Sequence, residues 1–386
     1  MKRKSVVIVA GEASGDLHGS HLIHALRKQY DAIDICGMGG RAMQEAGAEI
    51  LVDSDKLAVV GITEVLAKVS EVLKAMSLLK RTLAEARPDL LILIDYPEFN
   101  LHLAATGKKL GIPILYYISP QLWAWRSGRV KKIKKRVDHM AVILPFESEF
   151  YERNGVPVTF VGHPLMDSAV NRVVSRSPVL PENEEAVIGF LPGSRTGEVT
   201  SLLPVMLEGA ALLEKKIGKV RFLVSCAPSI KKEMILSLLS KHKLSNVEVT
   251  DETAAELLPR CHLAIVASGT VTLEAAICKT PIIITYMVSP LSYMLGKALI
   301  RVDHIGLVNL IAGKRIVPEL VQHRVTPEII CQTATALIAD PVAYQTMCSE
   351  LAVVKERLGS PGASEKVAEI ALSLMAGKEP RKNDGL

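Results

Sequence analysis

Short apolar runs rich in valine and isoleucine alternate with longer stretches of helical periodicity along the whole chain, which leaves few folds open. Each run is continuously apolar rather than alternating in polarity, as in strands that are buried on both faces of a parallel sheet. A glycine, proline or serine separates most runs from the helical stretch that follows. This rhythm predicts a doubly wound α/β structure. The first expected strands are Val6–Ala10, Ile33–Cys36, Leu90–Ile94, Ile114–Ile118, His139–Leu144 and Thr159–Val161.

The rhythm is interrupted once, by residues Asn171–Glu185, which are polar and lack periodicity and are therefore expected to form a linker. The rhythm then restarts with a second set of apolar runs. We therefore expect two Rossmann-like domains with parallel sheets that face each other across a cleft. The second set of expected strands is Val187–Leu191, Val220–Val224, Val247–Val249, Leu263–Val266 and Pro281–Thr285.

Composition excludes several classes of protein. The 386 residues contain 46 Lys+Arg and 41 Asp+Glu, a net charge of +5 that is too small for a dedicated nucleic-acid binder. Aromatic residues make up 4%, which disfavours a base-stacking platform. The six cysteines lie far apart without a CxxC pair, so we expect reduced thiols, a cytoplasmic location and no zinc site. The apolar run after Lys4 is too short for a signal peptide and is expected to be a strand.

The first strand is followed by the turn Gly11–Asp16, which carries two carboxylates, Glu12 and Asp16, with His18 one helical turn further on. Ligands bind at the carboxyl edge of such sheets, so this turn predicts a site. The sequence is not GxGxxG, which disfavours a dinucleotide. The alternative is structural: the glycines only make the turn, and Asp16 caps the helix.

Asp95 ends the strand Leu90–Ile94 and is expected to face the cleft. Partial burial would raise the pKa of this carboxyl group toward the range of a general base. The alternative is that Asp95 caps the helix beyond Pro97. Glu98 is a weaker candidate, because it falls in the first turn of that helix.

Both tryptophans of the chain, Trp123 and Trp125, precede a block of basic residues that extends from Arg126 to Arg136. The indole rings are suited to line a sugar ring or an acyl chain, or else they pack structurally. The basic block is either a solvated helix face or a surface for phosphates or anionic lipid.

Residues Thr63–Lys80 are expected to form a helix with an apolar stripe that includes Val65, Val69 and Val72. Such a stripe usually packs into a core. The alternative is an exposed apolar patch flanked by lysines, suited to a lipid interface.

Two strand-to-helix turns in the second half resemble anion cradles. The first, Gly193-Ser194-Arg195, offers backbone, hydroxyl and guanidinium donors. The second, Ser268-Gly269-Thr270, is followed by Glu274, a carboxylate suited to ribose hydroxyls. Together they predict a nucleoside diphosphate site, and the absence of GK[ST] disfavours ATP hydrolysis.

As a set, eight motifs in one order along nearly the full length resemble the lipid-A-disaccharide synthase family. They are GEASGD (Gly11–Asp16), IDYPEFN (Ile94–Asn100), SPQLWAWR (Ser119–Arg126), ILPFE (Ile143–Glu147), GHPLMD (Gly162–Asp167), LPGSR (Leu191–Arg195), SGTVTLE (Ser268–Glu274) and GLVNLIAG (Gly306–Gly313). The chain departs at Glu98, where the family more often has aspartate, so a role for residue 98 is in doubt.

The resemblance implies a GT-B fold in which residues 1–168 bind the acceptor, residues 169–340 bind UDP, and helices within residues 341–386 cross back onto the first domain. It implies UDP-2,3-diacylglucosamine as donor and 2,3-diacylglucosamine 1-phosphate as acceptor. The expected acceptor and lipid residues are Ser14, His18, Val65, Val69, Val72, Trp123, Trp125 and Arg126.

An α-linked donor and a β-linked product require one inverting displacement, for which Asp95 is the expected base and Glu12 or Asp16 the next candidates. Arg195, Ser194 and the helix that begins after Thr270 are expected to stabilise the departing UDP. Asn309 is expected to contact the nucleotide or the diphosphate. Without an Asp-x-Asp motif we expect no metal and no cofactor.

The acyl chains of both substrates imply attachment to an anionic membrane surface, at the cytoplasmic face of the inner membrane. The sequence leaves a homodimer open. Two rival functions are a UDP-sugar 2-epimerase and a non-catalytic carrier of a nucleotide sugar or lipid.

Overall fold

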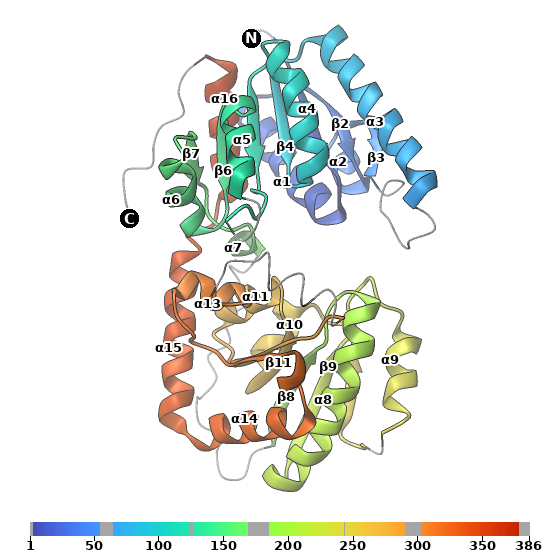
Figure 1. The fold of residues 1–386 in the computed structure, drawn as a ribbon, viewed down its shortest axis with the longest axis vertical. Helices are drawn as coiled ribbons and strands as arrows, with labels where there is room; N and C mark the ends of the chain where they lie inside the picture. The colour runs from blue at the N-terminus through green and yellow to red at the C-terminus, as the bar shows by residue number, and fades with distance from the viewer. Residues whose placement is uncertain are drawn as a thin grey trace. The chain divides into compact units, whose positions relative to one another are not determined.

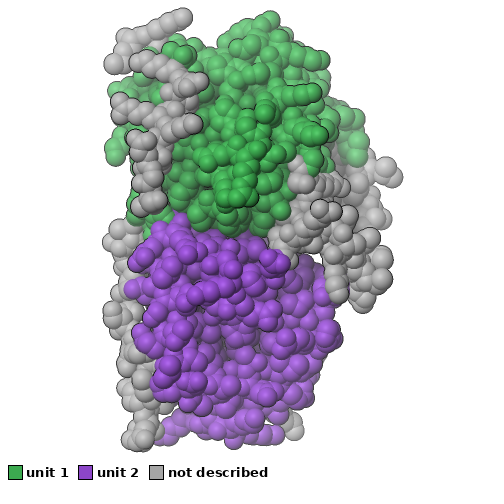
Figure 2. All heavy atoms as spheres, turned by 60° about the vertical axis from the view of Figure 1, so that its left-hand side comes forward, with its two compact units in different colours: residues 1–167, 359–386 green, residues 168–358 purple. Residues whose placement is uncertain are grey.

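The computed structural model describes residues 3–54, 65–123, 127–168, 185–242, 244–289, 293 and 303–377. The chain divides into two compact units, residues 1–167 with 359–386 and residues 168–358 (Figures 1 and 2). Each unit is built on one parallel sheet with helices packed against it, which confirms the predicted pair of Rossmann-like α/β structures.

Unit 1 contains a seven-stranded sheet of order β3-β2-β1-β4-β5-β6-β7, in which every neighbouring pair is parallel. Its strands are β1 (Lys4–Ala10), β2 (Ile33–Gly39), β3 (Glu49–Asp53), β4 (Leu90–Ile94), β5 (Ile114–Tyr117), β6 (His139–Val142) and β7 (Val158–Phe160). Its helices are α1 (Ala13–Gln29), α2 (Arg41–Glu45), α3 (Val65–Ala86), α4 (Pro97–Lys109), α5 (Val130–Arg136), α6 (Pro145–Arg153) and α16 (Ala363–Met375), and α7 (Leu165–Ser168) lies at the boundary.

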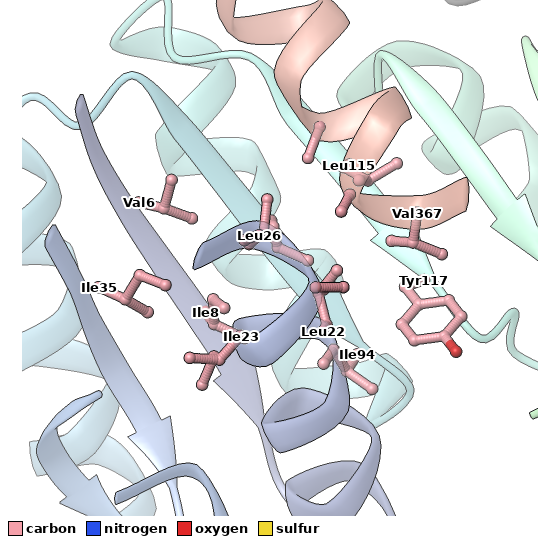
Figure 3. Close-up of a cluster of buried hydrophobic side chains, with 14 of the residues drawn as sticks. Val6, Ile8, Leu22, Ile23, Leu26, Ile35, Ile94, Leu115, Tyr117 and Val367 are labelled. Carbon is pink, nitrogen blue, oxygen red and sulfur yellow. The ribbon is translucent and has the colours of Figure 1, made fainter. Parts of the chain in front are cut away.

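Two clusters of buried side chains cover the two faces of this sheet. One contains Val6, Ile8 and Ile94 together with Leu22 of α1 and Val367 of α16 (Figure 3). The other contains the alternate strand residues, such as Val7 and Val9, with α3 and α4. The central strand β4 and most of β1 are therefore continuously apolar, because each face of the sheet needs apolar side chains.

Unit 2 contains a six-stranded sheet of order β10-β9-β8-β11-β12-β13, again with parallel neighbours. Its strands are β8 (Ala186–Leu191), β9 (Val220–Ser225), β10 (Val247–Thr250), β11 (Leu263–Ala267), β12 (Ile282–Tyr286) and β13 (Glu319–Val321). Its helices are α8 (Thr196–Ile217), α9 (Lys232–Leu239), α10 (Ala254–Leu257), α11 (Val271–Cys278), α13 (Leu307–Ala312), α14 (Pro327–Ala339) and α15 (Pro341–Arg357).

The C-terminal segment that packs on unit 1 begins at Gly359, which corrects the expected start at residue 341. Helix α15 belongs to unit 2 because its buried side chains, including Tyr344 and Leu351, pack against α11, α13 and α14. The Tyr344 hydroxyl also donates to the His262 carbonyl oxygen at 2.6 Å. Helix α16, by contrast, packs on α1 and β4 of unit 1.

The expected linker lies, except for Glu185, outside the described residues. Among the helices that are described, none is long and apolar enough to cross a membrane.

Candidate functional site

In unit 1 the order of the strands reverses between β1 and β4, which lie side by side with Ala10 paired to Ile94. Ligands of open α/β sheets bind outside the carboxyl ends of the strands at such a reversal. Glu12 follows β1 and Asp95 follows β4, so the topology brings these two predicted residues to one point of the sheet edge.

Asp95 is partly buried, and its surroundings raise the pKa of its carboxyl group to about 6. Burial is the larger cause, and the negative charge of Glu12 adds to it. Glu12 itself is exposed. A carboxylate with this pKa is mostly ionised at neutral pH and is suited to accept a proton.

Gly11 lets the two turns approach each other. A Cβ atom at residue 11 would lie 2.3 Å from ring atoms of Tyr96, which follows Asp95. The Tyr96 ring also packs against Phe99, with ring centroids 5.5 Å apart. The close packing of the Tyr96 ring therefore requires glycine at residue 11, in addition to the place of Gly11 in the turn.

The structure assigns Asp16 a structural role, which disfavours it as a proton acceptor. Its carboxylate is buried and accepts hydrogen bonds from the backbone N–H groups of Gly40 (2.7 Å), Ala42 (2.9 Å) and Met43 (3.1 Å). Asp16 therefore caps α2 rather than its own helix α1.

His18 lies one turn into α1 and is held neutral, because burial, with His21 as a lesser cause, lowers its pKa to about 4. Its Nδ1 atom is buried without a hydrogen-bond partner among the described residues. Burial likewise lowers the pKa of His163 to about 4, and repulsion between the protonated forms of His163 and His18 adds to the shift. Ser14 is exposed in the first turn of α1.

Trp123 is anchored by a buried carboxylate that the sequence analysis did not single out. Its Nε1–H donates to Glu147 Oε1 at 3.2 Å, and its ring packs edge-on against Phe146. Glu147 also accepts from the Leu144 N–H at 3.0 Å, and burial raises its pKa to about 7. These contacts favour structural packing for Trp123. Trp125 and Arg126 lie outside the described residues.

Residues 130–136 of the basic block form the short helix α5, whose Val130 and Ile133 are buried. Arg129 pairs with Glu98, and Arg136 donates to the Leu101 carbonyl oxygen at 2.8 Å. The lysines of this helix are exposed: Lys131, Lys132, Lys134 and Lys135.

The apolar stripe of α3 is divided between core and surface. Ala75, Leu79 and Leu83 are buried in unit 1, whereas Val69 and Leu73 are 49% and 63% exposed. Val72 is partly buried against the core, and the side chain of Val65 lies outside the described ones. The buried residues of α3 therefore support the predicted role in the core, and the exposed Val69 and Leu73 support the predicted role as an apolar surface patch.

Unit 2 has its own reversal between β8 and β11, where Leu191 and Val266 are paired. The turns after these strands are the two predicted cradles, Gly193-Ser194-Arg195 and Ser268-Gly269-Thr270. The topology therefore brings both cradles to one sheet edge, although 75 residues separate Gly193 from Ser268 in the chain.

The first cradle holds a carboxylate of the chain itself. Glu198 Oε2 accepts from the backbone N–H groups of Ser194 (3.1 Å) and Arg195 (3.3 Å), and its Oε1 accepts from Arg195 Nη1 at 2.9 Å. These donors are therefore arranged around an anionic group. Ser194 and Arg195 are exposed, and Gly193 adopts a φ of +115° that favours glycine.

The second cradle is more open. A Cβ atom at Gly269 would meet nothing within 4 Å, and Thr270 is exposed. The Ser268 hydroxyl donates to the Ile305 carbonyl oxygen at 3.2 Å. Burial raises the pKa of Glu274, which lies in the first turn of α11.

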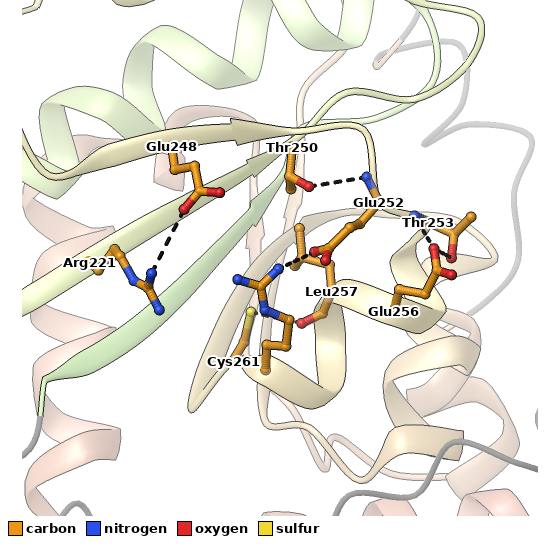
Figure 4. A network of polar contacts seen from close by, with 9 residues as sticks. Arg221, Glu248, Thr250, Glu252, Thr253, Glu256, Leu257 and Cys261 are labelled. Carbon is orange, nitrogen blue, oxygen red and sulfur yellow. Dashed lines mark hydrogen bonds and ion pairs between the residues drawn. The ribbon is translucent and has the colours of Figure 1, made fainter.

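Helix α11 is supported by α10, which a polar network attaches to the end of β10 (Figure 4). Thr250 Oγ1 accepts from the Glu252 N–H at 3.1 Å, and Arg260 pairs with Glu252. The Thr253 hydroxyl donates to Glu256 at 2.8 Å and closes a capping box.

The side-chain amide of Asn309 is fully engaged inside unit 2, which disfavours the expected direct contact of this amide with the nucleotide. Its Nδ2 donates to the Val317 carbonyl oxygen (3.0 Å) and to Glu319 (2.8 Å), and its Oδ1 accepts from the Ile316 (2.8 Å) and Val317 (3.1 Å) N–H groups. Two donors and two acceptor positions exhaust the amide group. Glu319, also buried, accepts from the Gly306 N–H at 3.0 Å, so the pair fixes the start of α13.

Within the described part of the chain, no cluster of three or more His, Cys, Asp and Glu side chains is arranged to hold a metal ion.

The model of the lipid-A-disaccharide synthetase family matches residues 6–371. A lipid-A-disaccharide synthase of Geobacter metallireducens is 47% identical over 379 residues, which cover 97% of this chain and 98% of that protein.

Two solved structures share the fold at low identity. The glycosyltransferase of kitacinnamycin has a TM-score of 0.65 and 14% identity, with 97% of this chain and 100% of that chain covered. A UDP-GlcNAc 2-epimerase from Neisseria meningitidis, bound to UDP-GlcNAc, has a TM-score of 0.62 and 15% identity, with coverage of 96% and 100%. The fold is therefore of GT-B type. The fold by itself does not distinguish a transferase from an epimerase, because both kinds of enzyme have it.

Proposed function

Because this chain belongs to the lipid-A-disaccharide synthetase family, we propose that it transfers 2,3-diacylglucosamine from UDP-2,3-diacylglucosamine to the 6-hydroxyl group of 2,3-diacylglucosamine 1-phosphate. It is a glycosyltransferase of lipid A biosynthesis that uses a UDP-sugar. The products are UDP and the β-1′,6-linked disaccharide 1-phosphate.

The single observation that carries the catalytic assignment is the partly buried Asp95 carboxylate, which lies near Glu12 at the strand reversal of unit 1. Asp95 accepts the proton of the acceptor 6-hydroxyl group as that oxygen bonds to C1 of the donor. The bond between C1 and the diphosphate oxygen breaks, and UDP leaves with the electron pair. One displacement inverts the configuration at C1.

The donor UDP binds unit 2. The N–H groups of Ser194 and Arg195, which bind the Glu198 carboxylate, support this assignment because they are arranged around an anion. The diphosphate replaces Glu198 there, and the backbone of Gly193 lies in the same turn. Residues Ser268, Gly269 and Thr270 supply a second set of donors, and Glu274 binds the ribose hydroxyl groups. Asn309 acts indirectly, through the segment that it holds.

The charge that develops on UDP is stabilised by Arg195 and backbone dipoles, without a metal ion. We therefore expect the rate of UDP release to stay within about twofold of its control value when EDTA is added in excess. Loss of activity with EDTA and recovery on addition of Mg²⁺ would show that a metal ion does this instead.

The acceptor binds unit 1, and the enzyme acts at the cytoplasmic face of the inner membrane. The exposed Val69 and Leu73 of α3 and the exposed lysines of α5 support contact with an anionic bilayer. This proposal keeps Ser14, His18, Val72 and Trp123 on the acceptor side. Val72 and Trp123 act there through the exposed parts of side chains that also pack within unit 1.

UDP release with the diacylated donor, with and without the acceptor, tests the proposed transfer. We expect release only when the acceptor is present, and a loss of about 10²–10⁴-fold in kcat for Asp95→Asn, the range for removal of a general base. UDP binding by this variant should be unchanged, because Asp95 lies in unit 1.

A change of configuration at C2 of the UDP-sugar, without net release of UDP, would instead indicate an epimerase. UDP binding without turnover would indicate a carrier.

A further inference from the structure

Asp95 and Tyr96 both adopt left-handed backbone conformations, with φ values of 44° and 45°. Residues other than glycine adopt this region at a cost in free energy, and two in succession are unusual. Such a conformation persists only where the surrounding structure holds it. The turn between β4 and α4 must therefore contain groups that hold these two residues.

Two buried side chains hold the backbone of Asp95. Its carbonyl oxygen accepts hydrogen bonds from Tyr116 Oη at 2.6 Å and from Asn100 Nδ2 at 2.7 Å. Both donors are 0% exposed. Asn100 Nδ2 also donates to the Ile94 carbonyl oxygen at 3.1 Å, one residue earlier.

The amide side of Asp95 is fixed as well. Its N–H donates to the Tyr117 carbonyl oxygen at 3.1 Å, which extends the pairing of β4 with β5 by one residue. The peptide groups on both sides of the Asp95 Cα atom are therefore attached to buried groups. Because these peptide groups set the direction of the Cα–Cβ bond, they also set the direction in which the carboxylate leaves the chain.

We propose that Tyr116 and Asn100 are positioning residues for the proton acceptor, which hold Asp95 in the left-handed conformation that directs its carboxylate to the acceptor hydroxyl group. This inference rests on the proposed role of Asp95. Both side chains bind the backbone of Asp95 and leave its carboxylate to the substrate.

Tyr116→Phe is the sharpest variant, because it removes one oxygen atom and leaves the ring in the core. Tyr117→Phe is its matched control. Tyr117 is the next residue of β5 and is equally buried, but its side chain packs in the cluster of α1 and α16 on the opposite face of the sheet (Figure 3). Its hydroxyl group lies near Ser364 rather than near the β4–α4 turn.

The experiment measures kcat and both KM values for Tyr116→Phe and Tyr117→Phe, each in the native chain and in the Asp95→Asn chain. We expect Tyr116→Phe to lower kcat about tenfold with both KM values within twofold, and Tyr117→Phe to leave kcat unchanged. In the Asp95→Asn chain, Tyr116→Phe should lower the residual rate no further, because it acts through the carboxylate. Asn100→Ser, which is too short to reach the carbonyl oxygen, should reproduce this pattern if Tyr116→Phe does not fold.

A kcat of Tyr116→Phe within twofold of the native value would overturn the inference, as would an equal loss in the native and Asp95→Asn chains. The second result would indicate a general effect on the structure. Failure of the proposed function is distinguishable, because Asp95→Asn alone would then retain activity.

Discussion

Glu12 and Asp95 follow neighbouring strands, but their exposure differs. Asp95 is partly buried, and Glu12, which is exposed, raises the pKa of Asp95 through its charge. A general base works best when its pKa lies just below the working pH, because it is then ionised and still strongly basic. We therefore predict that Glu12 acts on catalysis through the pKa of Asp95, without touching the proton that is transferred.

The pH dependence of kcat tests this relation. Asp95 must be ionised to accept a proton, so kcat falls as the pH decreases through the pKa of Asp95, about 6 in the unliganded chain. Glu12→Gln removes a neighbouring negative charge, which lowers the pKa of Asp95 and moves the acidic limb of the profile to lower pH. Glu98→Gln is the control, because Glu98 is paired with Arg129. An acidic limb that stays in place in Glu12→Gln, or moves equally in both variants, would contradict the assignment.

Single residues differ in how far the sequence reveals their roles. Asp95 was predicted because it ends an apolar run, a purely local signal. In the sequence, Asp16 and Asn309 look equally suited to bind a ligand. In the structure, the carboxylate of Asp16 binds the backbone of Gly40, which lies 24 residues further along the chain. The amide of Asn309 binds the buried carboxylate of Glu319. The buried Glu147 was missed because its partner Trp123 lies 24 residues earlier. Only the folded chain shows which polar groups are already paired.

Among the elements, every strand predicted for the first and for the second domain is present in the structure. The additional edge strand β3 was missed because none of its residues is fully buried, so it lacks a continuous apolar run. The strand β13 was missed because it has three residues and begins with Glu319. The other two edge strands, β7 and β10, were predicted, so an edge position does not by itself hide a strand. The central strands are evident from the sequence because burial on both faces requires continuous apolar runs.

Helix α3 carries a prediction about membrane binding. Replacing Val69 and Leu73 together by serine removes two half-exposed apolar side chains. The double variant should partition onto anionic vesicles roughly tenfold less, because it loses about 1–2 kcal/mol of free energy from burial of apolar surface in the bilayer. The free energy of unfolding should change little, because both side chains already face solvent. Vesicle co-sedimentation measures the effect.

The matched control is Val342→Ser with Val353→Ser on α15, where the two side chains are 76% and 42% exposed. This pair removes a similar apolar area from unit 2. Equal loss of vesicle binding in both double variants would show a nonspecific effect of hydrophobicity, and no loss in the α3 variant would exclude α3 from the membrane contact.

At the scale of the whole molecule, unit 1 is built from both ends of the chain. Val367, Ala368 and Ala371 of α16 are fully buried in the cluster that contains β1 and α1 (Figure 3). Lys4 Nζ at the start of β1 also donates to the Met375 carbonyl oxygen at 3.2 Å. The sequence alone did not place this boundary, because α15 and α16 both carry apolar residues and only the folded chain shows which unit buries them.

A chain that ends at Leu358 tests this dependence. It lacks α16, whose buried side chains stabilise unit 1 by roughly 5–10 kcal/mol, comparable to the total stability of a domain. We expect backbone amides of β1 and α1 to exchange at least tenfold faster, whereas unit 2, which ends at Leu358, should bind UDP within threefold of the full-length affinity. A chain that ends at Gly377 is the control and should match the full-length protein in both measurements. Protected β1 amides in the shorter chain would show that α16 only covers a core that is stable without it. Loss of UDP binding would show instead that unit 2 also depends on α16, so the two sheets would not be separate folding units.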